Sequence, residues 1–168
     1  MATDYSYSKG NLLNLFIHNG TNWVALAHGI NHSLSRSNET TSVSSKDMGI
    51  HDQQEVTASS WNMSGEYLFT AGNANIIMDM ADKAEPYSIC FAKVAQTEWS
   101  DGIQPVTDIS TNATWTVGST WVRYGDALVT SCEITANNGE TATISVEFTG
   151  SGALLKQPMT NIKSYTAE

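Results

Sequence analysis

Two alternating stretches joined by a short turn, between Tyr124 and Gly152, constrain the fold more than any other part of the sequence. In the first stretch the two parities carry different residues, with Leu128, Thr130, Cys132 and Ile134 on one and Ala127, Val129, Ser131 and Glu133 on the other. In the second stretch the apolar residues share one parity, at Ile144, Val146 and Phe148. A period of two places successive side chains on opposite faces of a strand. The Asn-Asn-Gly-Glu segment between the stretches tolerates the positive φ of a tight turn, so the sequence predicts a β-hairpin.

The same alternation recurs along most of the chain. It predicts strands in four further segments, at residues 11–27 (as a hairpin), 29–40, 55–69 and 87–95, and a start near Trp121 for the first strand of the central hairpin. A chain of 168 residues with no internal repeat and no linker suits a single domain, residues 1–168. The predicted fold class is mainly β: a sandwich or open barrel of antiparallel strands with one α-helix packed on the flank.

One segment, Asn73–Ala84, changes to a helical period. Its apolar residues recur at spacings of three and four, at Ile76, Ile77, Met80, Ala81 and Ala84. Asn73 or Asn75 is the expected N-cap, and Pro86 follows the expected end. The pattern therefore predicts one amphipathic helix of about three turns.

Three segments show little periodicity. Residues 41–54 combine Ser, Thr, Gly and charged residues, and we expect a long loop of the kind that often carries function in compact domains. Residues 153–168 hold one small apolar group and a polar end, and we expect a C-terminal arm outside the core. Residues 96–118 are rich in turn formers, with short strands expected at 106–109 and 114–117.

The chain is acidic, with a formal net charge of −9 and only 8 Lys and Arg residues, which are scattered singly. Proteins that grip nucleic acid need clustered basic residues, so this composition argues against a DNA-binding protein. The short apolar run at 12–17 has no basic region before it, which argues against a signal peptide and a membrane span. We therefore expect a protein made in a cytoplasm, in which the five Asn-x-Ser/Thr sequons have no role.

No residue pattern indicates a catalytic set, a metal site or a cofactor. His28 and His32 have HxxxH spacing, but residues four apart on a strand lie roughly 13 Å apart, too far to share one metal ion. Cys90 and Cys132 fall in predicted strands and are expected to be buried free thiols, with a disulfide between neighbouring strands as the alternative.

Two alternatives involve sugars. The hairpin carboxylates could form the acid pair of a small glycoside hydrolase, although exposed Glu residues on a hairpin are the commoner case. The five tryptophans could form the stacking face of a carbohydrate-binding β-sandwich: Trp23, Trp61, Trp99, Trp115 and Trp121. Trp61 shares a parity with Met63 and is expected in the core, whereas Trp99 and Trp115 lie in loop-rich sequence and could be exposed.

Four segments follow one another in a recognisable order. They are the strand-forming start GNLLNLFIHNG, the polar strand and loop at 33–49, the strand SSWNMSGEYLF, and the central hairpin with its Thr-rich strand ending in F-x-G-x-G. In this order, with one mid-chain helix, the sequence resembles the major tail tube proteins of long-tailed bacteriophages. The resemblance covers most of the chain except residues 96–120.

That resemblance implies a structural virion protein with no enzymatic activity and no cofactor. In such proteins six subunits form a ring, their inner sheets join into a barrel around a channel, and stacked rings conduct the genome DNA. The implied partners are other copies of the chain, the tape measure, tail terminator and distal tail proteins, and DNA that passes without specific binding, with no membrane. The implied location is the virion tail, assembled in the cytoplasm of the host bacterium.

The resemblance also implies two sets of candidate residues. The expected inter-ring contact loop consists of Ser44, Ser45, Lys46, Asp47, Met48, Gly49 and Ile50. The candidate lumen-facing acidic residues are Glu133, Glu140 and Glu147, since an acidic wall would repel the phosphates of passing DNA. The terminal segments are expected to become ordered only on assembly. The inner tube of a contractile injection machine, which uses the same fold, is a further alternative.

Overall fold

The structure, a computed structural model, describes residues 10, 13–26, 29–47, 49–94 and 117–166. The strands expected at 106–109 and 114–117, together with Trp99, Trp115 and His28, lie outside the described residues except for Val117. The elements are β1 (Leu13–His18), β2 (Trp23–Ala25), β3 (Gly29–Val43), β4 (Gln53–Leu68), α1 (Ala71–Lys83), β5 (Tyr87–Val94), β6 (Val117–Thr135) and β7 (Thr143–Gly150).

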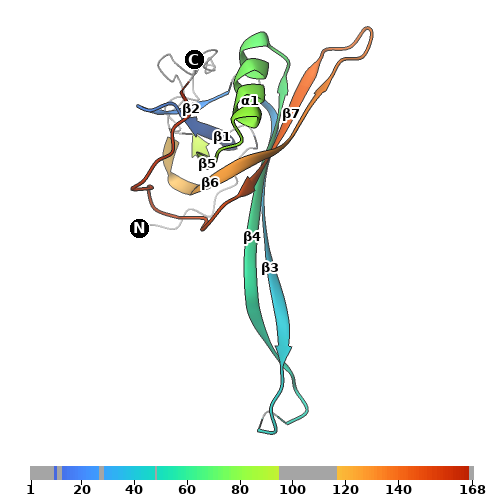
Figure 1. Ribbon diagram of the computed structural model, residues 1–168, viewed down its shortest axis with the longest axis vertical. Helices are drawn as coiled ribbons and strands as arrows, with labels where there is room; N and C mark the ends of the chain where they lie inside the picture. The colour runs from blue at the N-terminus through green and yellow to red at the C-terminus, as the bar shows by residue number, and fades with distance from the viewer. Residues whose placement is uncertain (1–9, 11–12, 27–28, 48, 95–116, 167–168) are drawn as a thin grey trace.

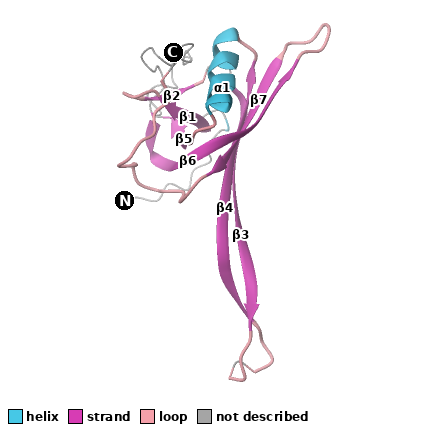
Figure 2. Cartoon of the chain, viewed as in Figure 1, coloured by secondary structure: helices cyan, strands magenta, loops and turns pink. Residues whose placement is uncertain are grey.

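The strands form one antiparallel sheet in the order β2-β1-β5-β6-β7-β4-β3. The long strand β6 joins its two halves, because residues up to Ala127 pair with β5 and residues from Ala127 onward pair with β7. The halves curl around a shared core that takes Leu15 and Ile89 from one and Met63 and Phe148 from the other. Figures 1 and 2 show β6 sweeping across between the halves, with α1 against the curved sheet. The predicted fold class, mainly β with one flanking helix, is confirmed.

Helix α1 begins two residues earlier than its apolar stripe predicted, and neither expected cap residue caps it. The N-cap is Thr70, whose Oγ1 accepts a hydrogen bond from the Asn73 backbone N–H at 3.2 Å. Asn73 is instead buried in the first turn. The expected inner face is confirmed at Ile76, Ile77 and Met80, which are buried in the shared core.

Trp61 of β4 packs its indole ring across the neighbouring strands β7 and β6. Its side chain is buried, as its parity with Met63 predicted, and its indole N–H donates to the Gly152 carbonyl at 2.9 Å. The indole ring lies against Gly125 of β6 and Gly150 of β7, where an added Cβ would overlap the ring. Both glycines are therefore required by close packing rather than by turn geometry.

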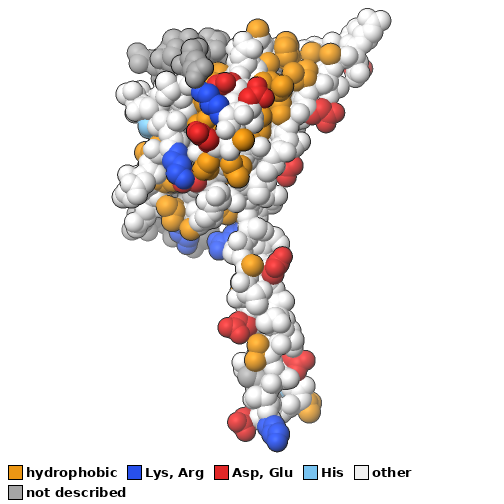
Figure 3. Space-filling model, viewed as in Figure 1, with side chains coloured by type: hydrophobic (Ala, Val, Ile, Leu, Met, Phe, Trp, Pro, Cys, Tyr) orange, Lys and Arg blue, Asp and Glu red, His pale blue; other side chains and the backbone are white. Residues whose placement is uncertain are grey.

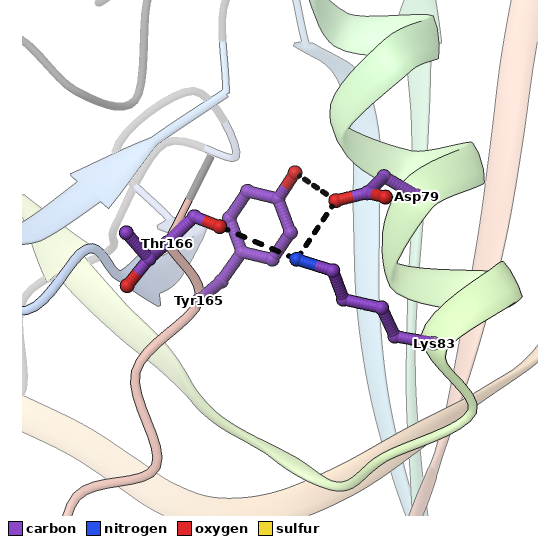
Figure 4. Close-up of polar contacts among 4 residues, drawn as sticks. All are labelled: Asp79, Lys83, Tyr165 and Thr166. Atoms are coloured by element: carbon purple, nitrogen blue, oxygen red, sulfur yellow. Dashed lines mark hydrogen bonds and ion pairs between the residues drawn. The ribbon is translucent and has the colours of Figure 1, made fainter. Parts of the chain in front are cut away.

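The sequence analysis expected residues 153–168 to form an arm outside the core. In the structure this segment is instead docked on the core through Tyr165. Tyr165 belongs to the shared core, and its hydroxyl donates to Asp79 of α1 at 2.6 Å. Lys83 reaches the same carboxylate at 3.2 Å and donates to the Thr166 carbonyl, as Figure 4 shows. The segment has a single buried aromatic amid polar residues, which gives no periodic signal, so the sequence does not reveal that it is docked.

The connection between β3 and β4 is shorter than the expected loop at 41–54. The two strands continue to Val43 and from Gln53, which leaves residues 44–52 as the connection. Every described residue from 51 to 60 is exposed, so this part of the ribbon has no buried face. A strand with two exposed faces shows no alternation of apolar and polar residues. The outer ends of β3 and β4 were therefore predicted as part of the loop.

Cys90 and Cys132 are free thiols, and no disulfide joins them. Cys90 is buried and Cys132 is half-buried. Burial raises the pKa of both thiols, so both are protonated near neutral pH.

Candidate functional site

A long two-stranded arm, formed by the outer parts of β3 and β4, projects from the body of the protein (Figure 1). Beyond the Arg36–Trp61 pair, each strand of the arm pairs only with the other in the part of the chain that the structure describes. Isolated two-stranded ribbons are marginally stable in water, so such an arm indicates a surface that is completed by a partner.

The expected contact residues lie at the far end of this arm. Ser44, Ser45, Lys46, Asp47, Gly49 and Ile50 are exposed there, and Met48 lies outside the described residues. Ile50 is 93% exposed, the highest value among the large hydrophobic residues of the described chain. An isoleucine in that position favours a contact outside the subunit.

A second feature is a polar face that runs across β6, β7, β4 and β3. Cross-strand partners share a face, and the register assigns to this one the residues Asn31, Ser33, Ser35, Asn62, Ser64, Glu66, Ser131, Glu133, Thr143, Ser145 and Glu147. Asn31 donates to Glu66 at 2.7 Å, and Asn62 donates to Glu147 at 3.4 Å. Leu68, opposite Thr143, and Leu128, opposite Thr149, share this face, which otherwise presents small hydroxyl, amide and carboxylate groups.

The charge on this face is of one sign. Across the four strands it carries five carboxylates, Glu39, Glu55, Glu66, Glu133 and Glu147, and among the described residues no Lys or Arg. Arg36, the basic residue of β3, pairs with Trp61 and so lies on the opposite face. The arrangement produces a negative electrostatic potential over this face.

The structure divides the three predicted acidic residues. Glu133 and Glu147 lie on the polar face, while Glu140 lies in the turn beyond the strands, where it accepts a hydrogen bond from the Asn137 side chain at 3.0 Å. Glu66 on β4 also belongs to the face, and the sequence analysis missed it. Its signal was the polar parity of β4, which places Asn62, Ser64 and Glu66 opposite the buried residues.

A β-bulge at Thr130 decides which residues of β6 reach this face. Val129 pairs with Phe148 and Ser131 pairs with Glu147, which leaves Thr130 unmatched. Because of the extra residue, Val129 and Cys132 both pack against the core, although they have opposite parity in sequence. The single parity expected for residues 128–134 is therefore wrong across the bulge.

Within the described residues, the four-stranded layer ends in two unpaired edges. One is β3, the last strand of the sheet. The other is β6 beyond Ala127, where within the described chain only β7 pairs with it. Free edges expose backbone N–H and C=O groups that can pair with another chain.

The part of the chain that the structure describes gives little support for a metal site, a membrane-spanning helix or a sugar-binding surface. It contains no cluster of three or more His, Cys, Asp or Glu residues able to hold a metal ion, and no helix that is long and apolar enough to cross a bilayer. Trp121 is 37% exposed, but the Arg123 guanidinium lies 4.9 Å from its ring centre and Phe91 packs edge-on. Two neighbours already occupy this ring, which does not favour a sugar platform.

Comparison with solved structures shows what this architecture is similar to. The tail of an empty gene transfer agent (GTA) particle, refined with C6 symmetry, matches with a TM-score of 0.65 at 13% identity, covering 90% of this chain and 100% of that one. The SPP1 tail tube matches with a TM-score of 0.59 at 12% identity, covering 94% and 81%. A chain of the anti-feeding prophage (AFP) baseplate matches with a TM-score of 0.53 at 12% identity, covering 93% and 98%. At these identities the likeness shows a shared fold.

Comparison of the sequence with known families is more specific. No curated protein matches the chain. The model of the phage tail tube protein family matches residues 7–156, which is most of the sequence. The chain therefore belongs to the phage tail tube protein family, and it is a structural subunit of a virion tail.

Proposed function

We propose that this protein polymerises as stacked rings of six copies, which form the channel for DNA delivery into the host, and that it has no enzymatic activity. The observation that carries the proposal is the four-stranded layer, with a polar acidic face and a free edge on each side. The C6 symmetry of the similar GTA tail supports the number of copies.

Ring closure follows from the two free edges. The outer edge of β3 in one copy would pair with the free part of β6 in the next, and repetition of this head-to-tail contact closes a ring. Closure removes every exposed edge of the layer, which protects the subunits from disordered aggregation.

The polar face would line the channel. DNA phosphates are repelled by Glu66, Glu133 and Glu147, and the absence of Lys and Arg on the described part of the face removes the groups that would hold DNA. Repulsion acts over about 8–10 Å at physiological salt, so it operates close to the wall. DNA would therefore slide past without specific binding.

The arm would join successive rings. Its tip, residues 44–50, lies far from the body and would reach the neighbouring ring. The two ends of the finished tube would meet other tail proteins, of the tape measure, terminator and distal tail classes, and assembly would occur in the cytoplasm of the host bacterium.

Electron microscopy of the purified protein tests the proposal directly. We expect rings or hollow rods at high concentration, and a strictly monomeric protein at all concentrations would refute it. Deletion of residues 44–50 should leave a folded subunit that no longer forms long tubes. A normal tube yield from this variant would show that the tip makes no inter-ring contact.

The channel assignment has a separate test. Tubes of the Glu66→Lys/Glu133→Lys/Glu147→Lys variant should retain DNA in a gel-shift assay at low salt and release it as salt rises. The control is Asp82→Lys/Glu85→Lys, which reverses two exposed charges elsewhere and is compared with the double variant Glu133→Lys/Glu147→Lys. If the control retains DNA as strongly, the polar face does not line the channel.

A further inference from the structure

An apolar patch lies between α1 and the β6–β7 hairpin. Phe69, Met78 and Ile134 are 42%, 43% and 43% exposed, and the Cys132 thiol lies 3.5 Å from the Met78 sulfur. Figure 3 shows hydrophobic side chains gathered over this region, while the arm below is largely polar. We call these four residues the docking patch.

The docking patch is not part of the channel wall described above. Ile134 pairs with Ile144, which is buried in the core, so both lie on the face opposite to Glu133. Exposed apolar side chains that gather in one place, here from the residue that follows β4, from α1 and from β6, are typical of interaction surfaces.

We propose that the docking patch receives the arm of a second copy of this chain in the adjacent ring. This inference rests on the proposed function and adds the receiving surface for the arm. It commits to one occupant, which is the arm segment containing Ile50 and Val56.

The positions of the two surfaces support this pairing. The arm projects from one end of the molecule, and the docking patch lies towards the other end, beside α1 (Figures 1 and 3). Copies that stack in the same orientation bring opposite ends together, which is a head-to-tail contact. The arm extends roughly 25 Å beyond the Arg36–Trp61 pair, if eight residues each rise by about 3.3 Å.

The chemistry of the arm matches an apolar receptor. Ile50 is 93% exposed and Val56 is 56% exposed, on a ribbon whose other residues are mostly polar. Val56 pairs with Thr40, just beyond a β-bulge in the arm. Both residues lie on the face of the ribbon opposite to the acidic face. The face of the arm that carries Val56 is therefore free to pack while its acidic side continues the channel wall.

Substitution in the docking patch tests the contact. Met78→Ser/Ile134→Ser should fold and form rings, but the critical concentration for tube growth should rise about tenfold or more, because two buried side chains are lost from every contact. The control is Ile162→Ser, which removes an apolar side chain of similar exposure, 37%, from the C-terminal segment. An unchanged critical concentration for the patch variant would overturn the proposal.

Cross-linking identifies the occupant independently of stability. A variant with Ile50→Cys and Met78→Cys, in a Cys132→Ser background, would be assembled and treated with a bis-maleimide; the buried Cys90 is protected. We expect covalent chains that lengthen with the tube, far beyond six copies. No cross-link in well-formed tubes, or chains that stop at one ring, would overturn docking between rings. Absence of any rings or tubes from the wild-type protein would instead refute the proposed function.

Discussion

Trp61 offers a quantitative test of how the four-stranded layer β6-β7-β4-β3 is held to the core. The indole ring lies against the backbone of Gly150, so the Gly150→Ala methyl would overlap it. Overpacking of this kind costs about 1–3 kcal/mol of the free energy of unfolding. Trp61→Leu loses the indole hydrogen bond to Gly152 and leaves a cavity, which together should cost about 3 kcal/mol.

The informative measurement is the double variant. Without the indole ring, the alanine methyl has room, and alanine also restricts the unfolded chain, which favours folding by about 0.5 kcal/mol. Gly150→Ala should therefore be neutral or slightly stabilising in the Trp61→Leu background, a coupling of about 1–3 kcal/mol.

Urea denaturation followed by circular dichroism measures all four proteins, at concentrations too low for self-assembly. Gly125→Ala is a second probe, because its methyl would meet the same ring from β6. Equal costs of Gly150→Ala in both backgrounds would refute the close contact between the glycine and the indole.

Three further predictions concern the body of the protein. Burial lowers the pKa of His32 from 6.5 to about 4, so the unfolded chain binds a proton at a higher pH than the folded protein does. The free energy of unfolding should therefore fall by about 3 kcal/mol between pH 6.5 and 4. In urea melts at a series of pH values, His32→Leu should show a smaller fall. Tyr165→Phe removes the hydrogen bond that lowers the Asp79 pKa, so that pKa should rise in an NMR titration and amides of the C-terminal segment should exchange faster; unchanged values would contradict the docking in Figure 4. Thr70→Ala should cost about 1 kcal/mol of stability through loss of the helix cap, whereas Thr70→Ser should retain it.

An element with one buried face shows that burial directly in its sequence. Ile144, Val146 and Phe148 alternate in sequence because they alternate between core and solvent, and their strand is β7. The helix was recognised because Ile77 and Met80 recur at its period. Its cap was mistaken because Asn73 is a good capping residue in isolation, while burial of its side chain in the fold leaves that task to Thr70.

The candidate site was only partly predictable. Glu133, Glu147 and the tip residues 44–50 are candidates that the family resemblance implies. The polar parity of β4 indicates that Glu66 faces away from the core, but only the strand register shows that this face continues to Asn31 of β3 and Ser145 of β7. The shift in facing at Thr130 was also hidden, because the pairing of β6 with β7 creates the bulge.

The sequence by itself determined the β-hairpin from Tyr124 to Gly152, the single helix, the acidic character of the chain and the family resemblance. Tertiary structure decided the rest: the extent of the exposed arm, the docking of Tyr165 into the core, and the gathering of carboxylates on one face. The physical reason is that a periodic pattern records burial on one side of an element. A ribbon with both sides exposed has no such pattern. A face assembled from strands distant in sequence is specified only by the register of those strands.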